Sequence, residues 1–440
     1  MFKRYAPAFL ACTLLAVGLA GTGRAPAARA DARTSAATIR VRMLTHWDAV
    51  TLKTFNPYVT EYQKLHPNVK IQITTVPFDQ LLKKISVSQL SGNGYDIYHI
   101  YDLWLPQMVK DHLFAPAPAA QVADIKAGYA SGVAGAASAN GTLYGYPTEV
   151  DDYALVYNRR LFKEAGIDGP PTTWAQLTTD AVKLTKRSGG RTVQQGFGTI
   201  TGWDSGVVHP WLSLLLSNGG DLLAPSNNKA AFNSPQGLET LNLYHTLVSK
   251  HATDPSMGSA TTYNTNFELG RTAMIIMADW WESGLQATMK SAFNDVAVAP
   301  IPVGPHGHTS TAVNYVWMYG VNQKSANQAA AWQFLQWLNS SKNANTSSRM
   351  GDWLMSQGII PSRTVDQRAH KAELDNSFMR PYVKALSTSR PFPIVLGGAE
   401  ITADLQKQIE RVDFGSEPPQ QALSTAESQV NSVLQGNSSD

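Results

Sequence analysis

The segment VKIQITTVPFDQLLKKISVSQLSGNGYDIYHIY, residues 69–101, decides the fold class of this 440-residue chain. Residues 69–76 alternate polar and apolar side chains with a period of two, which predicts a strand. Residues 78–90 carry leucine and isoleucine on one helical face, and residues 95–101 form another strand-like run. Upstream, residues 39–65 show the same succession of strand and helix. The resulting β-α-β-α-β order predicts a mainly parallel sheet in an α/β fold.

The ends of these three strands form the first candidate binding surface. Ligands of open α/β sheets lie beyond the carboxyl ends of the strands. Here those ends read THWD at 45–48, VPF at 76–78 and YDLW at 101–104. Two of the three combine a tryptophan with a carboxylate, and their candidate residues are Trp47, Asp48, Asp102 and Trp104.

The later part of the chain continues the α/β pattern. Residues 143–158 predict a long tyrosine-rich strand, whereas residues 115–139 are rich in alanine, proline, glycine and serine and only weakly patterned. Shorter strands are predicted at 197–201, 273–277, 296–301 and 312–321. Helices are predicted at 174–187, 210–216, 235–250 and 326–338, and the chain is mostly helical from residue 374. At about 100–200 residues per domain, the length indicates two or three domains.

The charge and cysteine content exclude several classes of function. The formal net charge is +3, but residues 1–30 contain four basic residues and no acidic ones. Without them the chain has 32 basic and 33 acidic residues, so it offers no field that would attract nucleic acid or anionic lipid. The only cysteine, Cys12, also lies in this segment. A chain without it has no disulfide, no cysteine nucleophile and no thiolate metal site.

The N-terminal segment has the pattern of a secretory signal peptide. Lys3 and Arg4 precede an apolar run at 5–20, which is short for a membrane span, and Ala28-Arg29-Ala30 fits a cleavage site. We therefore predict a signal peptide at 1–30, cleavage before Asp31, and an exported, soluble mature protein. An uncleaved membrane anchor is the alternative.

Motifs that would carry catalysis are missing. The sequence contains no nucleotide-binding P-loop, no HExxH zinc motif, no GxSxG nucleophile motif and no dinucleotide fingerprint. His306 and His308 lie in a proline- and glycine-rich linker without a nearby third ligand, so we expect no metal and no cofactor. Glu149, Asp151 and Asp152 could form a glycosidase acid/base pair, or could accept hydrogen bonds from sugar hydroxyls. We favour the second interpretation and expect no enzymatic activity.

Several segments resemble a known family in their order and spacing. The most specific is YGYPTEVDDYALVYNRRLFKEAGID at 144–168, and the others are YDIYHIYDLWLPQM (95–108), PPTTWAQLTTDAVKL (170–184), FELGRTAMIIMADWWESG (267–284), NQAAAWQFLQWL (327–338), GIIPSR (358–363) and SEPPQQALSTAESQVNSVL (416–434). Together they resemble the family 1 extracellular solute-binding proteins of ABC importers, the maltodextrin-binding type. The likeness covers about residues 38–435.

The resemblance implies a two-lobed periplasmic-binding-protein fold of type II, with hinge-linked lobes and a ligand cleft between them. Mapped onto this chain, the first lobe is 31–146 plus 304–345 and the second is 147–303 plus 346–440. The implied function is to bind a sugar or polyol by lobe closure and to deliver it to a membrane permease. A periplasmic location, or one on the extracellular face of the membrane, and a monomeric state are implied as well.

Sugar binding requires flat apolar rings for the C–H faces of the sugar and polar partners for its hydroxyls. The predicted cleft supplies both. Besides the four residues named above, its candidates are Glu149, Asp151, Trp203, Asp204, Trp280, Glu282, Asn314, Trp317 and Arg363. Trp280 is preferred over the adjacent Trp281. Packing is the alternative for the tryptophans, and a solvated surface position is the alternative for Trp203, Asp204 and Arg363.

Two other functions remain open from the sequence. An aromatic site with carboxylates also binds amines, which predicts a polyamine or another cationic ligand. A secreted glycosidase that uses Glu149 and Asp151 is the third interpretation. Trp174, Trp332, Trp337 and Trp353 lie on predicted helices, and we assign them to packing.

Overall fold

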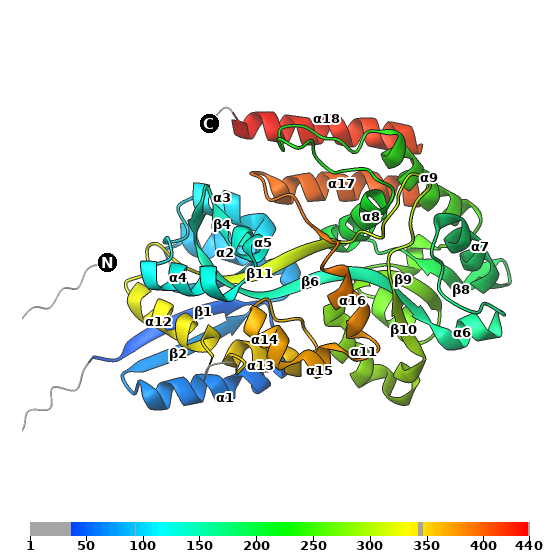
Figure 1. The fold of residues 1–440 in the computed structure, drawn as a ribbon. Helices are drawn as coiled ribbons and strands as arrows, with labels where there is room; N and C mark the ends of the chain where they lie inside the picture. The colour runs from blue at the N-terminus through cyan, green and yellow to red at the C-terminus, as the bar shows by residue number, and fades with distance from the viewer. Residues whose placement is uncertain (1–36, 93, 342–345, 439–440) are drawn as a thin grey trace, which may run out of the picture. The chain divides into compact units, whose positions relative to one another are not determined.

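The computed structural model describes residues 37–92, 94–341 and 346–438 (Figure 1). The predicted β-α-β-α-β unit is present as β1 (Ile39–Thr45), α1 (Ala49–Leu65), β2 (Val69–Thr75), α2 (Phe78–Leu90) and β3 (Ile97–Tyr101). β1 lies between β2 and β3 and is parallel to both. The carboxyl ends of these strands therefore lie at the same edge of the sheet, as predicted.

Helix α1 begins at Ala49, directly after Asp48, which caps it. The backbone N–H of Thr51 donates to Asp48 Oδ1 at 2.7 Å, which satisfies one of the free donors of the first turn. Pro57 lies inside this helix and does not end it.

The sheet is mixed rather than mainly parallel, which corrects the prediction. Its strand order is β2-β1-β3-β11-β6-β9-β8-β7, with β10 paired to β6 and β12 paired to β11. β6 (Gly145–Asn158) and β11 (Val313–Val321) are antiparallel to each other, and β11 is antiparallel to β3. The β-α-β rule fixes direction only for strands joined by a crossover helix, and β6 and β11 do not follow that pattern.

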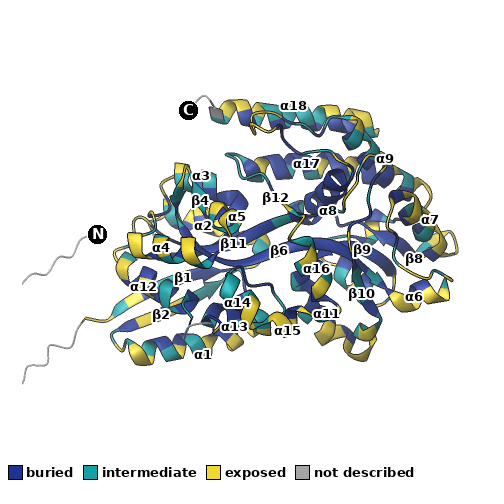
Figure 2. Ribbon diagram, in the orientation of Figure 1, coloured by how far each residue is buried: buried dark blue, intermediate teal, exposed yellow. Residues whose placement is uncertain are grey.

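Strand β6 joins the two parts of the sheet. Its first half pairs with β11, and its second half pairs with β9 (Thr272–Ala278) and β10 (Val296–Ala299). Figure 1 shows β6 and β11 running side by side through the middle of the described part. Almost every residue of β6 is buried (Figure 2). Side chains on β6 and β11 are therefore held between layers of the protein.

The part beyond β6 is a second α/β unit. β8 (Arg191–Gly198) runs parallel to β9, and β7 (Lys186–Ser188) lies at its edge. Helix α8 (Asp204–Ser217) starts before the predicted residue 210 and carries Pro210 in its interior. Nearly all of its residues are buried, so no polar face marks its first turns in the sequence.

Two helices were missed in the weakly patterned segment, α4 (Ala119–Gly128) and α5 (Ser131–Ala136). Their alanine- and glycine-rich sequences lack an apolar stripe, which is the signal on which the prediction depended. The other helices of eight or more residues are α7 (Trp174–Leu184), α9 (Pro235–Ser249), α11 (Glu282–Met289), α12 (Gln328–Asn339), α13 (Arg349–Ser356), α17 (Gly398–Asp413) and α18 (Pro419–Ser438).

Among the described residues, no helix is long and apolar enough to cross a membrane. The predicted signal peptide at 1–30 lies outside the described residues. The residue bounds of the two lobes stay a prediction.

Candidate binding site

Trp317 is the centre of an aromatic cluster at the carboxyl ends of β1 and β3. It lies on β11, opposite Tyr101 of β3 in the strand register. Its ring centroid lies 4.1 Å from that of His46, 4.8 Å from His99, 5.8 Å from Tyr101, 5.9 Å from Phe78 and 6.0 Å from Trp104. The register thus brings the predicted residues Trp104 and Trp317 together.

The aromatic cluster continues onto the second part of the sheet. The Trp203 ring, just before α8, lies 6.3 Å from Phe78 and 6.1 Å from Trp280. The Trp280 indole N–H donates to the Tyr315 hydroxyl at 2.9 Å. The neighbouring Trp281 is only 3% exposed and packs 4.9 Å from Phe267. Of the two adjacent tryptophans, Trp280 therefore belongs to the cluster and Trp281 to the core.

Four buried carboxylates lie beside these rings, and we call Asp102, Glu149, Asp151 and Asp279 the site carboxylates. Asp102 follows β3, Glu149 and Asp151 share one face of β6, and Asp279 follows β9. The Val316 N–H donates to Asp102 at 2.9 Å. Asp279 accepts from the backbone N–H groups of Asp152 at 3.0 Å and Ile360 at 3.4 Å.

Burial raises the pKa of these acids. Loss of solvation raises the pKa of Asp102 to about 8 and that of Asp279 to about 7, although backbone N–H groups oppose the shift. Burial raises the pKa of Asp151 well above its ordinary value, and the nearby charges of Asp279, Glu149 and Asp102 add to the effect. This repulsion indicates that the other three site carboxylates lie near Asp151.

Several buried polar atoms of this region have no hydrogen-bond partner in the described structure. They are the oxygens Asp102 Oδ1, Glu149 Oε2 and Asp151 Oδ1, and the indole nitrogens of Trp47 and Trp203. Buried polar groups in folded proteins nearly always have partners, because an unpaired one costs about 1–3 kcal/mol. Such atoms beside flat rings are suited to a ligand that carries several hydroxyl or amine groups.

Two buried histidines of the region, His46 and His209, have lowered pKa values. His209 Nε2 and the Tyr101 hydroxyl are 2.8 Å apart, and His209 Nδ1 and the Tyr153 hydroxyl are 3.2 Å apart. Burial lowers the pKa of His209 to about 3 and lowers that of His46 well below its usual range. His99 Nε2 lies 3.8 Å from Glu149 Oε1.

Three predicted site residues have other structural partners at the edge of the region. Asp48 is exposed and caps α1. The Asn314 amide donates to the Ser389 hydroxyl at 2.6 Å. Asp204 is half-buried and accepts from the Ser205 N–H at 2.6 Å.

Glu282 and Arg363 are also paired within the protein. Glu282 accepts from the Asn376 amide at 2.9 Å, and burial raises its pKa to about 7. Arg363 forms an ion pair with Asp124 at 2.7 Å and lies over the Tyr129 ring. Trp47 is 5% exposed and packs 4.0 Å from Trp353. A role of these residues in ligand binding stays a prediction.

Five residues of this region were not predicted from the sequence: Phe78, Tyr101, Tyr315, His46 and Asp279. Phe78 and Tyr101 lie at the predicted strand ends, but only tryptophans with adjacent carboxylates were chosen there. Asp279 directly follows a predicted strand, so the strand-end rule would have found it. Tyr315 required the register of β11, which the sequence does not specify.

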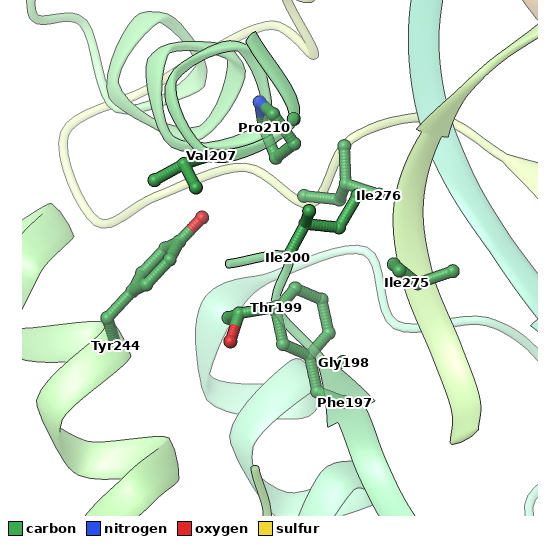
Figure 3. A pocket seen from close by; sticks show the side chains of 10 residues that line it. Phe197, Gly198, Thr199, Ile200, Val207, Pro210, Tyr244, Ile275 and Ile276 are labelled. Atoms are coloured by element: carbon green, nitrogen blue, oxygen red, sulfur yellow. The ribbon is translucent and has the colours of Figure 1, made fainter. Parts of the chain in front are cut away.

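Two cavities of the described structure lie away from this region. One, of about 10 Å³, lies among Phe197, Val207, Pro210, Tyr244 and Ile275, with the Tyr244 ring along one side (Figure 3). This volume holds one water molecule at most. The other, of about 310 Å³, is lined by Arg40, Gln89, Asp96, Asn322 and Lys324 among others, near the opposite ends of β1 and β3.

Comparison with known proteins identifies the family. Residues 48–345 match the model of the bacterial extracellular solute-binding proteins. The chain belongs to this family. The family binds solutes and is not catalytic, which contradicts the glycosidase interpretation. The described residues contain no group of histidine, cysteine and acidic side chains that could hold a metal ion.

Individual relatives agree with this assignment and with the predicted fold. A binding protein of Brucella abortus (strain 2308) is 24% identical over 396 residues, which is 86% of this chain and 90% of its own. The GacH receptor of Streptomyces glaucescens superposes with a TM-score of 0.79 at 21% identity, over 90% of this chain and 99% of its own. The ABC substrate-binding protein Lmo0181 of Listeria monocytogenes was solved in complex with cycloalternan. It superposes with a TM-score of 0.78 at 18% identity, over 90% of this chain and 99% of its own. The solute-binding protein therefore has the periplasmic-binding-protein fold.

Proposed function

We propose that this solute-binding protein is the extracytoplasmic substrate-binding component of an ABC importer. It binds a sugar or polyol between two lobes that close over it, and it presents the closed form to a membrane permease. One observation carries the proposal: aromatic rings and unpartnered polar atoms meet at the strand ends of this fold. The rings offer apolar area to sugar C–H groups, and the polar atoms offer partners to hydroxyls.

The relatives support a saccharide as the ligand class. The GacH receptor was solved with acarbose and an acarbose homolog, and Lmo0181 was solved with cycloalternan. Lmo0181 is also described as an ABC substrate-binding protein, which supports the importer context.

A melting-temperature screen tests the ligand class directly. A ligand that binds only the folded state raises the unfolding midpoint, so mono-, di- and oligosaccharides and polyols are compared with putrescine and spermidine. We expect at least one saccharide or polyol to raise the midpoint, and calorimetry then gives its affinity. Stabilisation by the polyamines alone would overturn the proposal.

Export and assembly state belong to the same proposal. The protein is synthesised with a signal peptide that is removed before Asp31, acts as a monomer outside the cytoplasm and uses no resident cofactor. Intact-mass measurement of the exported protein tests the cleavage site, and light scattering after size-exclusion chromatography tests the monomer. A mature chain that keeps residues 1–30 would contradict the first claim.

A further inference from the structure

The site carboxylates have no cationic partner, although they are buried. Asp102 is 1% exposed, Glu149 3%, Asp151 2% and Asp279 0%. Among the described residues, no lysine or arginine forms an ion pair with any of the four, and the one basic group paired with them is His99, 3.8 Å from Glu149. Burial of several like charges without a counter-charge is costly, so these acids hold protons in the ligand-free protein, and a cationic group can take the place of those protons.

The unpartnered atoms of the site carboxylates are all acceptors. Asp102 Oδ1, Glu149 Oε2 and Asp151 Oδ1 are buried oxygens without a donor. A sugar hydroxyl supplies one donor and brings acceptors of its own, whereas an ammonium group supplies three donors and no acceptor. An ammonium group therefore matches this set better than a hydroxyl does.

Aromatic rings surround the same carboxylates. Tyr315 lies opposite Asp151 in the β6–β11 register, and its ring lies 5.2 Å from Tyr101 and 6.1 Å from Tyr153. The charge of Asp151 contributes to the raised pKa of Tyr101, Tyr153 and Tyr315, which places it close to all three hydroxyls. Rings of this kind attract a cation through their π-electrons.

We propose that the ligand is an aminated saccharide, a mono- or oligosaccharide with at least one protonated amine that binds between Asp102 and Asp151. This inference rests on the proposed saccharide-binding function and specifies its substrate class. The sugar rings lie on the tryptophans of the aromatic cluster. The amine supplies the donors and the positive charge that the site carboxylates lack.

Matched pairs of ligands test the inference. Each neutral probe, such as glucose or cellobiose, is compared by calorimetry with the analogue that carries an amine in place of one hydroxyl on each sugar ring, glucosamine or the β-1,4-linked glucosamine dimer. Further pairs extend the panel to α-linked sugars, and spermidine represents an amine without a sugar. We expect the amine member of at least one pair to bind about tenfold more tightly or better.

The outcomes separate the inference from the proposed function. Equal or tighter binding of the neutral members overturns the inference and leaves saccharide binding intact. Binding of spermidine alone overturns both, and so does the absence of binding across the panel.

A charge-neutralising variant locates the amine. Asp151→Asn should abolish the preference for the amine member, because it weakens binding of that member about tenfold more than binding of its neutral partner. Asp102→Asn serves the same purpose if the first variant does not fold. Asp111→Asn is the matched control, because Asp111 is exposed and bonded to Gln107 on α3 (Leu105–Lys110). A full preference retained in both site variants would overturn the inference.

Discussion

Buried carboxylates occur in two different settings in this protein. Asp366 is 1% exposed, and it accepts from the Ser348 N–H at 2.6 Å, the Ser348 hydroxyl at 2.7 Å and the Ser347 hydroxyl at 3.2 Å. Asp102 is equally buried, but it accepts one backbone N–H and keeps its second oxygen unpartnered. The first carboxylate stabilises a turn, whereas the second is free to bind something else.

The comparison shows why burial alone does not distinguish a structural acid from a binding acid. Both pKa values are raised by loss of solvation, and only the supply of donors differs. Substitution should therefore have opposite consequences at the two positions, with loss of stability at Asp366 and loss of binding at the site carboxylates.

The largest expected effect is at Asp366. Asp366→Ala leaves the Ser348 N–H and two serine hydroxyls without their acceptor, and we expect it to lower the free energy of unfolding by about 3–5 kcal/mol. Urea denaturation of the ligand-free protein measures the change. A loss below about 1 kcal/mol would show that these hydrogen bonds are easily replaced by water.

The adjacent tryptophans extend the comparison to aromatic residues. Trp280→Ala should weaken ligand binding by about 1–3 kcal/mol and leave folding largely intact, because the ring is half-buried in the aromatic cluster. Calorimetry measures the affinity, and the melting temperature reports the fold.

Trp281→Ala is the matched control for that prediction. The Trp281 ring packs against Phe267 and Tyr263 in the core, so its removal should cost about 3–5 kcal/mol of stability. Equal affinities of Trp280→Ala and the unmodified protein would remove Trp280 from the site.

The sequence was sufficient where a local pattern determines the structure. The alternation in β2 and the apolar face of α2 predicted both elements nearly to the residue, and Asp102 and Trp104 directly follow the predicted strand β3. The long tyrosine-rich run was correctly predicted as one strand, β6.

Features that depend on distant pairing were not predictable. The antiparallel placement of β11 between β3 and β6 brings Trp317 to Tyr101 and Tyr315 to Asp151, and no local signal encodes that register. The sequence also did not reveal that Asp48 caps α1, or that Arg363 already pairs with Asp124. The residue types indicated where a binding site could lie, but tertiary contacts decide which partner each side chain has.

The smallest effect we predict is a dependence of stability on pH. The folded state holds the protons of Asp102 and Asp279 up to about pH 8 and about pH 7, whereas the unfolded state releases them near pH 4. Stability is therefore lost as pH rises through this window. His46 and His209 act in the opposite direction, but only below about pH 6.5, because their pKa values are lowered.

Between about pH 6.5 and about pH 8 the histidines no longer contribute, and only the buried acids make stability depend on pH. Over this range we expect the ligand-free protein to lose roughly 1–2 kcal/mol of unfolding free energy. Asp102→Asn removes the acid whose pKa is raised to about 8, so the loss of stability above about pH 7 should be smaller in this variant. Asp111→Asn, which changes an exposed carboxylate, should keep the full slope. Urea denaturation at the two pH values measures the free energy of unfolding of the unmodified protein and of both variants. An unchanged slope in Asp102→Asn would mean that Asp102 is ionised in the ligand-free fold, and that its unpartnered oxygen is hydrated rather than held for a ligand.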